Sequence, residues 1–137
     1  MRVKQVVVTI VALASVVACG GGGAAAGAPE DASIEDFCAA QDWLVVEGMA
    51  RAGANFSRPS AEELAQLLRD WAREFVRVGT PENMSSEARV GFERFVDRAD
   101  DLEASDVEGG SLNWVYGNWE NDEEKAFAHF MTNTCGA

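Results

Sequence analysis

The side chains best suited to contacting a ligand are three aromatic residues clustered in the segment 112–119. Trp114, Tyr116 and Trp119 lie within six positions of one another, and Tyr116 is the only tyrosine of the chain. Clustered aromatic rings can stack on sugars or anchor a protein interface. Large aromatic rings are also commonly buried, so the same segment could cover the core of a small domain. We favour the covering role and keep a small-ligand or peptide site as the alternative.

Carboxylates are the second group that could carry chemistry. They lie on both sides of the aromatic segment: Asp97, Asp100, Asp101, Glu103, Asp106, Glu108, Glu120, Asp122, Glu123 and Glu124. Carboxylate oxygens bind Ca²⁺, but an EF-hand loop that began at Asp101 would need glycine where Asp106 stands. Nothing in the sequence places two of these acids across a cleft, as a glycoside hydrolase requires. We therefore predict a solvated acidic face, with an acidic-residue hydrolase as the less favoured alternative.

Histidine chemistry is limited to one side chain, because His129 is the only histidine. One histidine makes neither a metal site nor a catalytic triad. A Glu-x-x-His di-metal motif also fails, because Ala126 stands three residues before His129. The sequence therefore predicts no enzyme, no catalytic residue, no metal site and no cofactor.

The charge balance limits the class of partner. The 137 residues include 23 acids and 11 lysines or arginines, which gives a net charge of -12. Phosphate binding needs a basic surface, so a nucleic-acid partner is excluded. Docking of the folded part on anionic lipid is disfavoured for the same reason. We expect the charge mainly to keep the domain soluble.

The first 18 residues have the organisation of an export signal. Arg2 and Lys4 precede an apolar run from Val6 to Ala18, which is shorter than the roughly 20 residues of a membrane-spanning helix. The run ends in Val16-Val17-Ala18-Cys19, which resembles the lipobox of bacterial lipoproteins. The resemblance implies that the signal is cleaved before Cys19 and that this cysteine receives a diacylglyceryl group. An ordinary export signal is the alternative.

A lipid on Cys19 would place the protein on the extracytoplasmic face of the cell membrane. Two or three acyl chains hold a protein firmly, whereas one chain gives only marginal binding. The following residues 19–32 are rich in glycine and alanine, and we expect them to form a flexible linker. The folded domain is then predicted to span residues 33–137.

Four stretches of this domain show helical spacing of apolar residues, at about 33–51, 60–78, 85–103 and from 121 onward. The second is the clearest, because Ser60 and Glu63 form a capping box and Gly79 ends the pattern. Residues 105–117 show a looser pattern. Strand-like alternation is absent. The sequence therefore predicts an all-α fold, a small antiparallel four-helix bundle.

The assignment of Cys19 to lipid leaves Cys38 and Cys135 as a pair in an oxidising compartment. Cys38 lies one turn into the first predicted helix and Cys135 at the end of the fourth, which is the same end of an up-down-up-down bundle. A catalytic thiol would need a nearby base, but His129 lies six residues before Cys135, on a different helix face. We therefore predict a disulfide between Cys38 and Cys135.

Several segments are similar to those of small exported helical proteins of actinobacteria, lipoproteins without an assigned activity. These segments are residues 37–40, 78–84, 88–97 and the terminal Thr134-Cys135. The resemblance supports fold and location, and it implies no functional residue. The sequence as a whole predicts a membrane-anchored exported lipoprotein that acts as a binding or envelope-associated module.

Overall fold

The computed structural model describes residues 22–53, 58–110 and 121–136. Within these ranges all regular structure is helical, which confirms the predicted all-α class. The elements are α1 (Ile34–Ala52), α2 (Ala61–Val78), α3 (Ser86–Asp100), the 3-10 helix η1 (Ala104–Gly110) and α5 (Asp122–Cys135).

Local hydrogen bonds explain why the first two helices begin and end where the sequence predicts. The Ser33 side chain accepts a hydrogen bond from the Asp36 amide, at 3.0 Å, and starts α1. At α2, the Ser60 side chain accepts from the Glu63 amide while Glu63 Oε2 accepts from the Ser60 amide, which completes the capping box. Gly53 and Gly79 follow the two helices as C-caps.

The third helix is shorter than predicted. α3 ends at Asp100 instead of Glu103, and η1 follows in a stretch that the sequence pattern left irregular. Asp106 Oδ2 accepts a hydrogen bond from the Glu103 amide at 2.9 Å. This local bond competes with helix continuation, as short acidic side chains commonly do. Val107 is fully buried, so η1 also contributes to the core.

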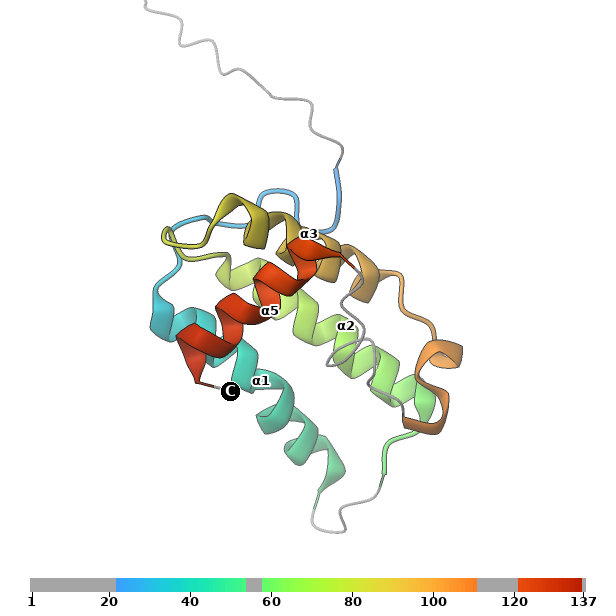
Figure 1. Ribbon diagram of the computed structural model, residues 1–137. Helices are drawn as coiled ribbons and strands as arrows, with labels where there is room; N and C mark the ends of the chain where they lie inside the picture. The colour runs from blue at the N-terminus through green and yellow to red at the C-terminus, as the bar shows by residue number, and fades with distance from the viewer. Residues whose placement is uncertain (1–21, 54–57, 111–120, 137) are drawn as a thin grey trace, which may run out of the picture.

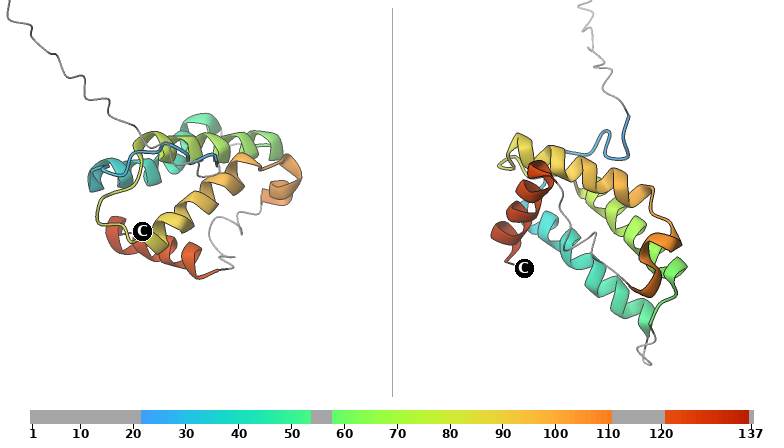
Figure 2. Two further views of the ribbon diagram at one scale, coloured as in Figure 1. Left: turned by 90° about the horizontal axis from the view of Figure 1, so that it is seen from above. Right: turned by 45° about the vertical axis from the view of Figure 1, so that its right-hand side comes forward.

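The four longer helices contact one another in a closed sequence, in which α1 packs on α2, α2 on α3, α3 on α5 and α5 on α1. Figure 1 shows α1 and α2 side by side with opposite directions, and α5 crossing from α3 toward α1. η1 packs on α2, beside the beginning of that helix (Figure 2). The fold is therefore bundle-like.

The core between these helices is built largely from aromatic rings. Phe75 of α2 is fully buried, and rings from all four helices surround it at centroid distances of 5.4–6.3 Å. These rings belong to Phe37, Trp71, Phe92, Phe95 and Phe127. Edge-to-face and tilted pairs dominate, as the ring quadrupole favours. The Trp71 indole also donates to the Ala40 carbonyl at 2.9 Å, which satisfies its only polar group.

A disulfide joins the two ends of the helical chain. Cys38, in the first turns of α1, is bonded to Cys135 at the end of α5, with Cα atoms 5.3 Å apart. The pairing agrees with the one predicted from the sequence, and it fixes the contact between α1 and α5.

Candidate functional site

The segment that enters the helical domain lies against it, and we call residues 22–32 the N-terminal strap. At its beginning, the Ala24 amide donates a hydrogen bond to Asp97 Oδ1 of α3 at 2.6 Å. Ala25 is 9% exposed and belongs to the hydrophobic core. Figure 2 shows the strap, in blue, running along α2 and α3.

The other end of the strap pairs with the turn between α2 and α3. The Thr80 amide donates to the Pro29 carbonyl at 2.8 Å, and the Ala32 amide donates to the Thr80 carbonyl at 3.2 Å. Gly79 has a φ of +87° and lies so close to the strap that a Cβ there would stand 2.1 Å from the Pro29 oxygen. Glycine is therefore required both for the backbone conformation and for the close approach.

The strap corrects one expectation about residues 19–32. Glycine and alanine composition predicts a flexible linker, yet residues 22–32 make hydrogen bonds and core contacts with the helical domain. The physical reason is that small side chains allow a backbone to approach a helix surface closely, and that Asp97 and Thr80 supply partners for the strap backbone.

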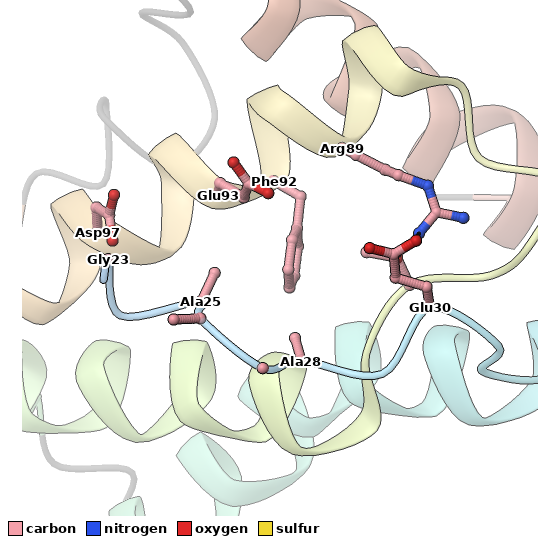
Figure 3. Close-up of a pocket in the computed structure, with 11 residues that line it drawn as sticks. Gly23, Ala25, Ala28, Glu30, Arg89, Phe92, Glu93 and Asp97 are labelled. Carbon is pink, nitrogen blue, oxygen red and sulfur yellow. Dashed lines mark hydrogen bonds and ion pairs between the residues drawn. The ribbon is translucent and has the colours of Figure 1, made fainter. Parts of the chain in front are cut away.

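A cavity of about 450 Å³ lies between the strap and α3. Figure 3 shows Phe92 pointing from α3 toward the strap between Ala25 and Ala28. Charged side chains close its two ends, where Asp97 faces Gly23 and Arg89 meets Glu30. The cavity volume is in the range of small-molecule sites.

Arg89 is engaged by the surrounding chain. It donates to the Thr80 hydroxyl and to the Pro81 carbonyl, the latter at 2.8 Å, and it lies 3.4 Å from Glu30. Asp97 at the other end accepts the Ala24 amide hydrogen bond. These charged groups hold the strap and the α2–α3 turn in place. The cavity is therefore better explained as a gap left where the strap packs on α3 than as a catalytic site.

The acidic residues do not form one solvated face. Glu124 is 4% exposed and makes an ion pair with Arg98 of α3, and Asp97 binds the strap. The neighbouring pair of Arg94 and Glu123 spans 3.7 Å between the same two helices. The prediction of a solvated face is therefore wrong for Glu124, because α5 turns this side chain toward α3.

The other candidate residues fall outside the described ranges or stand apart. Cys19 and the aromatic residues Trp114, Tyr116 and Trp119 lie outside the described residues, so their predicted roles stay predictions. His129 is exposed on α5. Among the described residues, no three metal-ligating side chains come together, and no helix is long and apolar enough to cross a membrane.

Sequence reasoning missed the strap and the pair of Arg98 with Glu124. Both are contacts between residues far apart in the chain, separated by 73 positions for Ala24 and Asp97 and by 26 for the ion pair. One local signal, Gly79, was present in the sequence. This glycine indicates that a helix ends there, but the sequence does not show that the strap packs against it.

Comparison with known protein families, curated proteins and solved structures found no match to this chain. The function is therefore argued from the residues and their geometry.

Proposed function

We propose that this protein is an exported lipoprotein, anchored through Cys19 to the extracytoplasmic face of the cell membrane, and that its domain acts by binding. In this proposal residues 1–18 are the cleaved signal, and neither nucleic acid, a metal nor a cofactor takes part. The lipobox pattern Val16-Val17-Ala18-Cys19 carries the anchoring. The function proposed is that of a binding or envelope-associated module, not of an enzyme.

The docked strap supports a particular form of anchoring. Ala24, the first strap residue bonded to α3, lies five positions after Cys19. Covalent geometry limits five residues to a span of about 18 Å. A lipid on Cys19 would therefore hold the α3 side of the domain beside the bilayer, instead of letting the domain move at the end of a long linker.

We also propose that α1, α2, α3 and α5 form a four-helix bundle closed by the disulfide. The closed sequence of contacts between these helices and the bond between Cys38 and Cys135 support this arrangement. A rigid bundle held at the membrane suits a module that presents a surface to a partner. Binding is favoured over catalysis because the charged groups of the strap cavity bond to the chain itself.

Metabolic labelling with an alkyne analogue of palmitate tests the anchor. We expect the wild-type chain to incorporate label and to remain with the membrane fraction, and Cys19→Ala to lose the label. A variant carrying Cys38→Ser and Cys135→Ser is the matched control and should keep both label and location. Labelling that survives in Cys19→Ala would reject the lipid site, whatever the fraction in which that variant is found.

Cross-linking in intact cells tests the binding role. An envelope-associated module should form defined adducts when it is anchored, and Cys19→Ala should lose them. Adducts that are identical in anchored and released protein would show that membrane placement plays no part in binding. An absence of adducts from both proteins would contradict the binding role.

A further inference from the structure

A second cavity, of about 570 Å³, lies where the end of α1 meets the beginning of α2. Its apolar wall includes Ala52, Pro59 and Leu67. Three arginines, Arg51, Arg58 and Arg69, also line it. The volume falls within the range of natural small-molecule sites, which combine apolar walls with a few polar groups.

Two of these arginines are unusual for this chain. The described residues include nine lysines and arginines, of which seven have a carboxylate oxygen within ion-pair distance. The two others, Arg58 and Arg69, line the same cavity. The chain holds 23 acids, so cations without an acidic partner stand out in it.

The bonds that these arginines make leave donors free. Arg58 Nη2 donates to the Gly109 carbonyl at 2.6 Å. Arg69 donates to the Leu102 carbonyl and, at 2.9 Å, to Gln66 Oε1. All these acceptors are neutral, and among the described residues neither arginine has a carboxylate within ion-pair distance. A guanidinium has five N–H donors in a planar fork, and each arginine retains several of them.

The acids beside the cavity are directed elsewhere or are exposed. Glu63 accepts from the Ser60 amide and hydroxyl at 2.8 and 2.9 Å, and these bonds hold it at the helix cap. Glu62 is exposed. Arg51 is already paired with Glu47, which together with Asp70 raises its pKa. The uncompensated charge at the cavity therefore comes from Arg58 and Arg69.

We propose that this cavity binds a small organic anion with an apolar body and one carboxylate. A carboxylate matches the planar fork of an arginine and gains charge-assisted hydrogen bonds. A single negative charge fits best, because the carboxylates of Glu62 and Glu63, which also line the cavity, would repel a second one. The inference rests on the proposal that the domain acts by binding, and it assigns that binding a site outside residues 112–119.

The test uses three probes of the same shape and different charge: 2-naphthoate, neutral 2-naphthalenemethanol and cationic 2-naphthylmethylammonium. The full chain, with or without lipid, is kept in zwitterionic detergent with empty micelles as the blank, and binding is measured by titration calorimetry. We expect saturable 2-naphthoate binding about tenfold tighter than that of the alcohol, and no binding of the cation. Equal affinity for all three probes, or no binding of 2-naphthoate, would overturn the proposal.

Variants assign the site. Arg58→Gln and Arg69→Gln should each weaken 2-naphthoate binding by about tenfold and leave alcohol binding unchanged. Arg77→Gln is the matched control, because Arg77 lies at the other end of α2 and pairs with Glu74. Unchanged alcohol binding also reports that the cavity is intact. If a Gln variant loses the alcohol too, Arg58→Lys and Arg69→Lys, which keep the charge, must restore 2-naphthoate selectivity, or the proposal fails.

The outcome is independent of lipid anchoring. Palmitate labelling can succeed while 2-naphthoate fails to bind, which would reject this site and leave the anchor. The reverse result would retain the site and reject the anchor.

Discussion

At the scale of single residues, two glycines inside helices have opposite surroundings. A Cβ on Gly91 of α3 would stand 2.1 Å from the Glu123 carbonyl oxygen of α5. Among the described residues, a Cβ on Gly48 of α1 would meet only Leu67 Cδ2, at the ordinary contact distance of 3.6 Å. Gly91 therefore permits the close packing of α3 on α5, whereas Gly48 leaves room for a larger side chain.

We expect Gly91→Ala to destabilise the protein by about 1–3 kcal/mol, because a backbone oxygen must move to make room. Gly48→Ala is the matched control and should be neutral or stabilising by up to about 1 kcal/mol, since alanine favours the helix. Urea unfolding followed by circular dichroism measures both changes. Equal effects of the two substitutions would show that the approach of α5 to Gly91 does not limit stability.

At the scale of elements, helix boundaries in this chain are set by short-range bonds at their ends. The capping box of α2 shows the principle most clearly. Hydrogen bonds from the Ser60 amide, and then from its hydroxyl, lower the pKa of Glu63 below the ordinary value of 4.5. A group whose pKa is lower in the folded state stabilises that state above its unfolded pKa, and the contribution disappears as the pH falls through the folded value.

The capping box therefore predicts a pH-dependent effect of Glu63→Gln. At pH 7 the variant should melt at a lower temperature than the wild type, and this difference should shrink once the pH falls below the ordinary value of 4.5. Glu62→Gln is the matched control, since Glu62 is the exposed neighbour in the same helical turn. Melting curves between pH 3 and pH 7 measure the difference. A gap that stays constant across this range would contradict a role for the ionised carboxylate.

The strap is the element that the sequence described least well. Its composition carries no periodic pattern, and its partners, Asp97 of α3 and Thr80 of the α2–α3 turn, lie far from it in the sequence. Asp97→Ala should remove hydrogen-exchange protection from the Ala24 amide and leave the Thr80 amide protected. Asp101→Ala, at the C-cap of the same helix, is the control and should leave both amides unchanged. Protection of Ala24 that survives Asp97→Ala would show that the strap does not depend on this bond.

At the scale of the whole molecule, the disulfide joins positions 97 residues apart. It connects the first turns of α1 to the last turn of α5 and so constrains nearly the whole helical chain. In the chain-entropy model a cross-link restricts mainly the unfolded state, and the effect grows with the length of the loop.

Replacing both cysteines, by Cys38→Ser and Cys135→Ser, should lower the free energy of unfolding by about 4–5 kcal/mol in that model. Urea unfolding without reductant measures the change. Cys19→Ser is the control and should leave the free energy of unfolding unchanged, because the strap contacts begin after it. If the double variant unfolded at the wild-type urea concentration, the cross-link would not contribute to stability.

The sequence by itself determined the helical class, the beginnings and ends of α1 and α2, and the pairing of Cys38 with Cys135. Caps such as Ser60 with Glu63 join residues within one helical turn, so they can be recognised from the sequence alone. The cysteine pairing followed because the chain has three cysteines and the assignment of Cys19 to lipid leaves two. The lipid site at Cys19 also comes from sequence, and it stays a proposal.

Only the tertiary structure decided how distant segments meet. It placed residues 22–32 on α2 and α3, turned Glu124 toward Arg98, and brought Arg58 and Arg69 to one cavity. None of these contacts produces a periodic pattern in the sequence, because each joins residues that lie far apart along the chain. Their free energy depends on burial and on partners from other helices, and both arise only once the helices have packed.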